Sequence, residues 1–515
     1  MVLAWHGDRV RIAGVGRERG RGVADELAGV PVEVSGETET AEAPGAARVL
    51  SAAEWAVCQY GRVDLGDERR NRRAVEMATR MAQQPEGSLP APMESRASLR
   101  GAYLLLSNPE VSMEALLEPH TSQTMAAARQ VPLVLMMEDT TELDYTRHRQ
   151  KSGLGPIGDG RGRGLLLHET LALVPGATKE QAQLLGLAYL QVVLRTPSPS
   201  PRPHAGSSAE ARLWQESAIG VGSPTEGRRW VHVSDCGSDV FEYMVECRRR
   251  GKDFVLRAQH NRLLEWSEGS AEADGHSAAH LHDYVRSLSA QEGIGYSVHV
   301  QATKTQPARE ARVAVTWGQV SLVPPPQGSD LGKEHGPLTV SVTRAWEPEP
   351  PEGARGLEWL QLSSLAVESA ADALRIIDWY SLRWWCEDFH KCLKSDCTVE
   401  RAQLDEADDI RRLLGFAAPI AVRLLQVRQA ARQSPDLPAQ AVVEPLMVEV
   451  LARRQKLASE VMTISEFWRA VARMGGHLGR KGDGPPGWQT LWKGWCRLTD
   501  LTEGARLFLS QNPST

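Results

Sequence analysis

The chain has 515 residues, enough for several domains and a large core, and 42% of them are hydrophobic. It carries 59 basic and 65 acidic residues, so its overall charge gives no attraction to nucleic acid, and any DNA contact must come from local patches. No apolar run reaches the ~18 residues of a membrane span, there is no signal-peptide pattern, and the seven cysteines form no Cys-x-x-Cys pair. A membrane span, secretion and a zinc site are therefore poor interpretations, and reduced thiols are expected.

Residues 1–50 mix Gly, Arg and Glu with little periodicity, which predicts a disordered extension or a start codon placed too far upstream. Residues 51–125 are predicted to be mostly helical, with prolines marking a loop near residues 85–92. The clearest basic patch of the chain, residues 69–73, begins one of these helices. Its arginines, Arg69, Arg70, Arg72 and Arg73, fit either a solvated helix face or a DNA-binding surface.

Two apolar runs with the length of buried strands end in an aspartate. Residues 131–139 end at Asp139, and residues 230–235 end at Asp235. Residues 165–174 and 185–194 add two more strands, which together with the first predict a three-stranded meander. A carboxylate at such a position is expensive to bury unless it binds something, although a plain turn residue is the commoner reading for any one of them.

Short alternating segments between residues 254 and 359 predict a β insertion, and the chain is predicted to be helical from about residue 395 to its end. The alternation is clearest at residues 295–301, 311–316 and 338–343, with prolines between the segments.

A helix from Tyr380 to Lys394 carries the most informative pattern of the chain. At about 100° per residue, one stripe of this helix holds Tyr380, Arg383, Glu387 and Lys394, with Lys391 beside it and His390 at its edge. Apolar residues fill the opposite side. A solvated amphipathic helix also alternates in this way. One acid set among Arg, Lys and Tyr donors is, however, the chemistry that holds a divalent metal and a phosphodiester together. Asp139, Asp235 and Glu387 form a set that could hold two magnesium ions.

This arrangement resembles the DDE transposases of bacterial cut-and-paste elements, specifically the insertion-sequence-four group that includes the transposon-five enzyme. The helical signature, Tyr380-x-x-Arg383-x-x-x-Glu387 followed by Lys394, is the most specific part of the resemblance. Weaker matching segments extend it from about residue 50 to the end: residues 65–70, 101–103, 107–112, 137–145, 254–257, 357–360 and 472–476, with Trp488, Trp492 and Trp495. One departure is Asp235-Cys-Gly-Ser-Asp239, where the transposon-five type has a basic residue and then an acid.

The resemblance implies an α/β fold, namely a ribonuclease-H-like catalytic domain with a β-strand insertion, flanked by helical N- and C-terminal domains. The implied boundaries are residues 1–50 for the extension, 51–125 for DNA binding, 126–260 with 357–430 for catalysis, 261–356 for the insertion and 431–515 for dimerisation. It further implies two Mg²⁺ ions, with Mn²⁺ as a substitute, held by Asp139 as the bridging ligand and by Asp235 and Glu387.

The expected partners are double-stranded DNA, as inverted-repeat ends and as target, and a second copy of the chain, with no membrane. The expected location is the bacterial cytoplasm, at the nucleoid. The residues expected to contact DNA are Tyr380, Arg383, Lys391, Lys394, Arg257, Trp359, Arg69, Arg70 and Arg73. Trp359 would stack on a flipped base, and the C-terminal seam of Trp488, Leu491, Trp492 and Trp495 would face a partner helix or pack within its own chain.

The expected chemistry is nicking, hairpin formation and strand transfer. Two alternatives stay open: a ribonuclease-H-like nuclease without strand transfer, and a catalytically silent DNA-binding inhibitor. The region expected to bind the transposon end and the Trp-rich tail argue against the first, and the intact set of three acids argues against the second.

Overall fold

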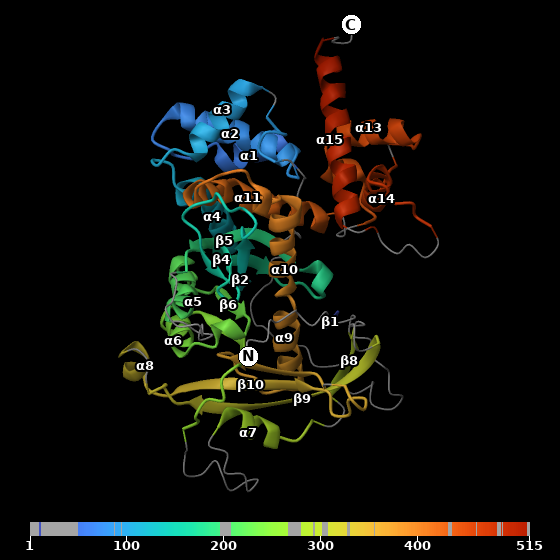
Figure 1. Ribbon diagram of the computed structural model, residues 1–515. Coiled ribbons are helices and arrows are strands. Elements are labelled where there is room, and N and C mark those ends of the chain that lie inside the picture. Colours follow the sequence, from blue (N-terminus) through green and yellow to red (C-terminus); the bar gives the residue numbers. More distant parts are fainter. Residues whose placement is uncertain are drawn as a thin grey trace. The chain divides into compact units, whose positions relative to one another are not determined.

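The computed structural model describes residues 10–11, 50–86, 88–93, 95–195, 208–265, 280–291, 294–300, 307–326, 330–354, 356–430, 435–459, 461–480, 486 and 488–511 (Figure 1). The prediction for residues 1–50 falls almost entirely outside these residues. The chain divides into two compact units, each of which combines helices with a sheet. Unit 1 takes in Ser208–Ser223 and Val231–Arg383, and unit 2 takes in Ala46–Ser207, Pro224–Trp230 and Trp384–Thr515.

Unit 1 is built on a mixed sheet in the order β8-β9-β10-β11-β7-β6. All neighbours in it are antiparallel except β6 and β7, which run parallel. The strands are β6 (Arg229–Ser234), β7 (Asp253–Arg257), β8 (Gly295–Val300), β9 (Arg309–Leu322), β10 (Leu338–Trp346) and β11 (Glu358–Ser363), and the short β1 (Val10–Arg11) pairs with β8. The strands predicted for a β insertion are therefore confirmed as strands, and they continue the sheet of β11 and β7 rather than forming a separate one.

The helices of unit 1 are α5 (Ser208–Gly220), α6 (Phe241–Arg249), α7 (Leu281–Ser287), α8 (Asp330–His335) and α9 (Ala370–Ser381). Helix α9 contacts β7, β9, β10 and β11, and Ser369 caps it by accepting the Asp372 N–H (Figure 1). Side chains from α6 and the strands, such as Phe241, Phe254 and Leu362, form a core that excludes water. This core holds the ends of β6 and β7 in place.

The sheet of unit 2 is the predicted meander. Strand β4 (Gly162–Val174) pairs antiparallel with β2 (Leu133–Asp144), with β5 (Gln183–Val193) and with the short β3 (Gly155–Ile157). Its apolar run Leu165–Leu167 is buried, and so is Leu171–Leu173. A strand buried on both faces reads as a nearly continuous apolar run, which is why these segments could be recognised from sequence.

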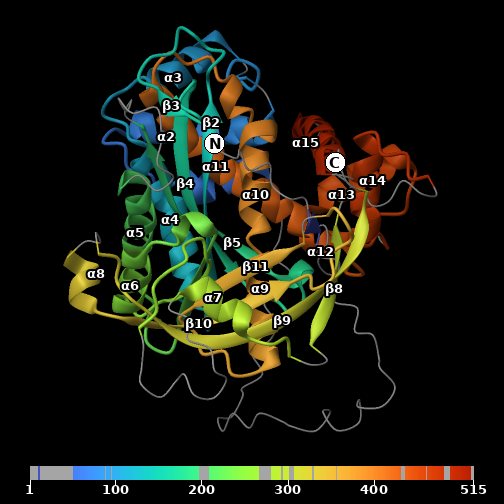
Figure 2. The same cartoon turned by 60° about the horizontal axis from the view of Figure 1, so that its bottom comes forward.

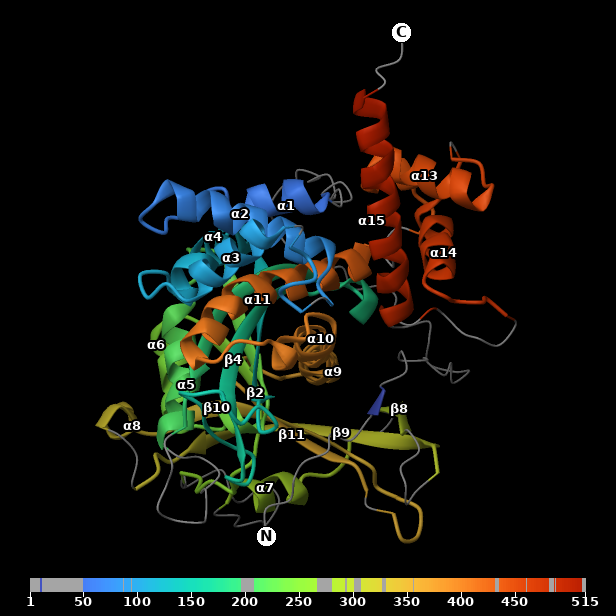
Figure 3. The same cartoon turned by 45° about the horizontal axis from the view of Figure 1, so that its top comes forward.

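Helices surround this sheet, and the predicted helical regions are confirmed on both sides of it in the chain. Helices α2, α3 and α4 contact α11, and α10 contacts β2 and β4 (Figures 2 and 3). The helices of unit 2 are α1 (Ala52–Tyr60), α2 (Glu68–Gln83), α3 (Arg96–Leu106), α4 (Met113–Ala128), α10 (Trp384–Lys391), α11 (Ala407–Ala430), α12 (Ala439–Val442), α13 (Pro445–Gln455), α14 (Ile464–Met474) and α15 (Trp488–Gln511). Among the described residues no helix combines the length and the apolar character needed to cross a membrane.

The C-terminal helices α14 and α15 approach one another through two glycines. A Cβ atom on Gly475 would lie 1.8 Å from the Thr490 carbonyl oxygen, and one on Gly494 would lie 1.8 Å from that of Val471. Beside this crossing the Trp468 and Trp495 rings stack, with centroids 5.1 Å apart. Leu491, Trp492 and Trp495 are all buried. At these three positions the predicted seam on α15 therefore packs within its own chain, which is one of the two alternatives that the sequence left open.

Candidate functional site

Asp139 lies in the middle of β2, where it pairs with Glu169 of β4. The prediction that the strand ends at Asp139 was wrong. Thr140 and Thr141 are β-branched residues that suit a strand, and β2 continues beside β4 as far as Asp144. The Asp139 side chain is buried to 6% exposure, and its Oδ1 accepts the Thr140 N–H at 2.8 Å. Its carboxylate therefore lies buried on one face of the β2–β4 sheet.

Glu387 lies on α10, and its side chain is exposed. The opposite side of this helix is buried through Cys386 and Phe389, as the sequence pattern predicted. Because α10 packs on β2 and β4, Asp139 and Glu387 come from elements in direct contact. Both carboxylates act electrostatically on the same two buried groups, Glu169 and His390.

Glu169 and His390 form a buried pair that joins β4 to α10. The His390 Nε2 and the Glu169 Oε1 lie 2.5 Å apart, and the two side chains are 8% and 0% exposed. Burial raises the pKa of Glu169 to about 7, although His390 opposes the rise, and Asp139 and Glu387 add to it. Burial opposes a charge on His390 as well, but Glu169, Asp139 and Glu387 together outweigh this effect and raise the pKa of the imidazole. The pair thus lies buried beside two further acids that favour a proton on it.

The sequence interpretation missed Glu169 and placed His390 only at the edge of the helical stripe. A signal was present: His168, Glu169 and Thr170 interrupt an otherwise apolar strand, and all three are buried. Polar groups are costly inside a sheet unless they have partners, so such an interruption marks a site that the fold has to satisfy. His168, next to Glu169 on β4, has a partner on β2, because its Nδ1 lies 2.8 Å from Thr140 Oγ1.

Lys394 contacts β2, whereas Lys391 is exposed. The Lys394 Nζ donates to Thr141 Oγ1 at 2.7 Å, two residues along β2 from Asp139. Lys394 belongs to a π-helical turn, Cys392–Asp396, that follows α10. Such single turns occur often at functional sites because they change which way a side chain projects.

The predicted single helix from Tyr380 to Lys394 is interrupted. Helix α9 ends at Ser381, and α10 begins at Trp384. Between them the N–H groups of Leu382 and Arg383 bond back three residues, to Trp379 and Tyr380. The Ser381 hydroxyl donates to the Asp378 carbonyl at 2.5 Å, a local bond that bends helices. The boundary between the two units falls here, so Tyr380 and Arg383 belong to unit 1 while Glu387 and Lys394 belong to unit 2.

Asp235 belongs to unit 1 and directly follows β6, as predicted. It caps the short 3-10 turn Cys236–Ser238, because its Oδ1 accepts the Gly237 N–H at 2.8 Å. The Cys236 thiol beside it has its pKa raised to about 11, mainly by burial, with Asp235 adding to the rise and Arg257 and Arg383 opposing it. Asp235 therefore shares its surroundings with two of the predicted phosphate-binding arginines.

Tyr380, Arg383 and Arg257 lie in the same part of unit 1. Burial raises the pKa of the Tyr380 hydroxyl, and the positive charges of Arg383 and Arg257 oppose the rise. Arg257 is the last residue of β7, as the sequence predicted. Two cations and a hydroxyl beside one carboxylate form a donor set suited to a phosphate group.

Asp239, at the end of the segment in which the chain departs from the transposon-five pattern, has a structural role. It is 2% exposed and accepts the N–H groups of Gln259 and His260, both at 2.7 Å, and it forms an ion pair with Arg262 at 2.6 Å. These bonds tie the loop after β6, which carries Asp235, to the loop after Arg257. A buried acid of this kind is satisfied only because several donors converge on it.

Trp359 is partly exposed on β11, opposite Ala345 of β10. It is absent from the buried core of unit 1, whose members include Leu362 on the same strand. An aromatic ring in this setting retains a face that a base could contact.

The basic patch of the N-terminal region divides into exposed and paired arginines. Arg69 is exposed, whereas Arg70 forms an ion pair with Glu110 at 2.6 Å and Arg73 one with Glu76 at 3.0 Å. The Arg73 guanidinium also crosses Gly101 of α3, where a Cβ atom would lie 2.6 Å from its Cζ. Arg70 and Arg73 thus hold neighbouring elements together as well as contributing charge.

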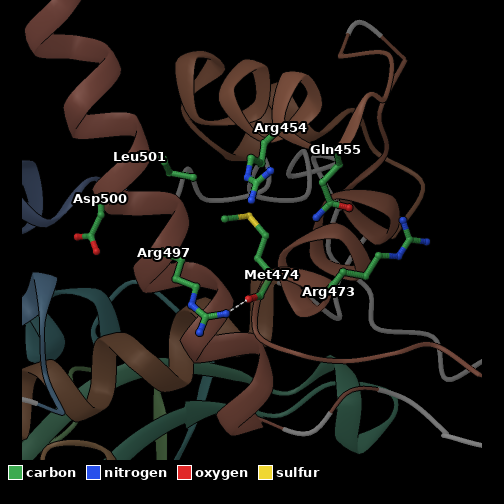
Figure 4. A pocket seen from close by; sticks show the side chains of 7 residues that line it. All are labelled: Arg454, Gln455, Arg473, Met474, Arg497, Asp500 and Leu501. Carbon is green, nitrogen blue, oxygen red and sulfur yellow. Dashed lines mark hydrogen bonds between the residues drawn. The ribbon is translucent and has the colours of Figure 1, made fainter.

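The C-terminal region contains a hollow of about 660 Å³ (Figure 4). Its lining is Arg454, Gln455, Arg473, Met474, Arg497, Asp500 and Leu501. Arg497 donates to the Met474 carbonyl at the end of α14, as the dashed line shows. Arg454 and Arg473 lie in the last turns of α13 and α14, where a helix C-terminus favours a cation, so both arginines have a structural reason to be there. With a single carboxylate in its lining, the hollow also lacks the ligands for a metal pair.

Two segments of the chain match known protein families. Residues 52–111, which span α1 to α3, match the family described as transposase DNA-binding. Residues 419–514, from within α11 through α15, match the family described as transposase Tn5 dimerisation domain. The two matches lie on either side of the residues that carry Asp139, Asp235 and Glu387.

Proposed function

These two matches identify the chain as a Tn5-like transposase, and we propose that it is a cut-and-paste enzyme whose active site consists of Asp139, Asp235 and Glu387. DNA and a second copy of the chain are its partners. The observation that carries the proposal is the meeting of Asp139 and Glu387 in unit 2, on elements in contact and beside one buried pair. A nuclease without strand transfer would need neither matched region.

The proposal includes a ribonuclease-H-like fold for the catalytic region. Its support is the order of elements: the antiparallel strands β2, β4 and β5, then β6 with Asp235, and later α10 with Glu387. We propose the boundaries 51–125 for DNA binding, 126–260 with 357–430 for catalysis, 261–356 for the β insertion and 431–515 for dimerisation.

Transposases of this kind depend on divalent metal, and the donor chemistry of unit 2 fits such a group. Asp139 and Glu387 are carboxylates, which Mg²⁺ prefers. The Oε2 of the fully buried Glu169 has no hydrogen-bond partner among the described residues, as expected where a water bound to such a group would donate to it. Within the described part of the chain no three metal-binding side chains are already grouped. We propose that Asp139, Asp235 and Glu387 would hold two Mg²⁺ ions, which would supply an activated oxygen and neutralise charge on the phosphodiester.

The remaining residues would orient DNA. Tyr380, Arg383 and Arg257 would bind phosphate oxygens beside Asp235, because two guanidinium groups and a hydroxyl can donate to them together. Lys394, which donates to Thr141, would place a further cation on the side of β2 that carries Asp139. Lys391 would add another positive charge on the exposed face of α10. In this proposal the 3′-hydroxyl freed by the nick attacks the opposite strand to form a hairpin. A second water opens the hairpin and frees the 3′-hydroxyl again, which then attacks target DNA.

The test uses the purified full chain and a duplex that carries the inverted repeats flanking its gene, with Mg²⁺ present. Asp139→Ala, Asp235→Ala and Glu387→Ala should each abolish nicking, by at least a hundredfold, while binding of the end in a gel-shift assay persists. Asp159→Ala is the matched control, because Asp159 is an exposed acid that pairs with the exposed Arg161. Wild-type cleavage by one of the three variants would remove that residue from the active site.

A further inference from the structure

We propose that Glu169 and His390 are a positioning pair that fixes Glu387 of α10 against Asp139 of β2, and so sets the spacing of the two carboxylates. The inference rests on the proposed metal-dependent function and adds two residues to it. Neither of them is expected to touch DNA or metal directly.

The first step is the register of the sheet. Asp139 and Glu169 are direct cross-strand partners on β2 and β4, and such partners project to the same face with Cβ atoms about 5 Å apart. Next to them the Thr140 N–H donates to Asp139 Oδ1, and the Thr140 hydroxyl contacts His168 Nδ1 at 2.8 Å. The position of Asp139 is therefore set by the β2–β4 pairing.

The second step is the helix. His390 follows Glu387 by three residues on α10, so the two side chains lie one turn apart on neighbouring positions of the helix surface. Because His390 binds Glu169 at 2.5 Å, the turn of α10 that carries Glu387 is tied to the residue opposite Asp139. The buried hydrogen bond between His390 and Glu169 therefore links the strand pair that carries Asp139 to the helix that carries Glu387.

A second contact limits how α10 can rotate. Lys394 donates a hydrogen bond to Thr141 on β2. Lys394 follows His390 by four residues, and Thr141 follows Asp139 by two. Two contacts to different strands fix a helix better than either alone. A third acid buried next to Asp139 and Glu387 is unfavourable for folding, and an apolar pair of similar size would pack β4 to α10 without it. This points to a use of Glu169 beyond packing.

The variants are Glu169→Ala, His390→Ala and Glu169→Gln, the last of which keeps an oxygen acceptor for His390. Direct binding of Mn²⁺ to the full chain is measured by isothermal titration calorimetry at fixed pH, with Asp139→Asn to identify the site. We expect Glu169→Ala and His390→Ala to weaken Mn²⁺ binding about 10- to 100-fold, as losses of residues that orient metal ligands do, and Glu169→Gln to stay within a few-fold of wild type. The double alanine variant should be no weaker than the worse single one, because both disrupt one contact.

A thermal melt and end binding by gel shift accompany each titration, since a merely structural pair would lower the melting temperature and leave Mn²⁺ affinity unchanged below it. That result would overturn the positioning role, and so would equal weakening by Glu169→Gln and Glu169→Ala. If the wild-type chain bound Mn²⁺ at Asp139 but cut no DNA, the proposed function would fail while the binding comparison would still decide the role of the pair. If Asp139→Asn lost no Mn²⁺ binding, both the metal site and the pair would be wrong.

Discussion

Trp359 shows how exposure distinguishes two roles for one aromatic residue. A core tryptophan replaced by alanine typically costs about 3–5 kcal/mol of stability and would slow every step together. Trp359 is partly exposed on β11, so its removal should leave most of unit 1 intact.

We therefore predict that Trp359→Ala spares the first nick and slows hairpin formation about 10- to 100-fold, which is the rate equivalent of losing a base stack of roughly 1–3 kcal/mol. Single-turnover cleavage that resolves nicked and hairpin products is the measurement, alongside a thermal melt. Equal slowing of both steps together with a lowered melting temperature would return Trp359 to the core.

Arg69 is the arginine of the basic patch best placed to contact phosphate, because it is exposed while Arg70 and Arg73 pair with acids. Arg69→Ala should weaken binding of transposon-end and unrelated DNA alike and reduce the slope of log affinity against log salt by about 1, as expected when one phosphate contact is lost. Arg161→Ala, at another exposed arginine, is the control and should leave the slope unchanged. An unchanged slope for Arg69→Ala would show that Arg69 is only a solvated surface residue.

At the level of elements, His120 joins three of them around the DNA-binding region. On α4, its Nδ1 contacts Gln59 of α1 at 2.5 Å, and its Nε2 accepts the Leu187 N–H of β5 at 3.1 Å. Burial lowers the pKa of His120 to about 4. The unfolded chain, with a pKa near 6.5 for histidine, binds this proton more readily, so His120 contributes stability that is complete above about pH 6.5 and is lost as the pH falls toward 4.

The expected contribution of His120 is a loss of about 2 kcal/mol in the free energy of unfolding between pH 7.5 and pH 5. His120→Gln removes the titrating group and should flatten this part of the pH dependence, even if it destabilises the chain at pH 7.5. Urea unfolding of both proteins at the two pH values provides the measurement. Parallel losses in wild type and variant would assign the acid sensitivity to other groups.

The second half of α15, within the dimerisation region, exposes several large apolar side chains. Leu501 and Phe508 are 43% and 66% exposed and lie seven residues apart, hence on one face of the helix. We predict that Leu501→Glu with Phe508→Glu abolishes the complex of two DNA ends in a native gel while single-end binding and the melting temperature persist. Leu263→Glu, at an exposed leucine of unit 1, is the matched control. A two-end complex that survives the double substitution would place the dimer contact elsewhere.

Most elements of the fold could be predicted from the sequence, because apolar periodicity identifies long helices and buried strands. The end of β2 was missed because the apolar run stops at Asp139, whereas the strand continues through the polar Thr140 and Thr141, which pair with β4. The break between α9 and α10 was missed because it lies in local hydrogen bonds, such as that from the Ser381 hydroxyl to the Asp378 carbonyl, which leave the apolar pattern unchanged. Glu169 could not be joined to His390 by spacing, since the two residues are 221 positions apart and only the packing of α10 on the sheet brings them together.

On the scale of the whole molecule, the two family matches and the proposed catalytic residues occupy consecutive parts of the chain, and each part depends on a few polar or tight contacts. Asp239 secures the loops around Asp235, the pair of Glu169 and His390 secures α10, and His120 secures α1 and α4. Mutations that remove activity can therefore lie outside the residues that touch DNA.

The glycine crossing of α14 and α15 has a consequence for how such an enzyme can be tuned. Because Gly475 and Gly494 leave no room for even a methyl group, a single alanine at either would wedge the last helix away from its support without altering any charge. The orientation of α15, which carries Leu501 and Phe508, would then no longer be fixed by its packing on α14. The assembly of two copies would then depend on how closely α14 and α15 approach each other. The proposed catalytic residues would be unchanged.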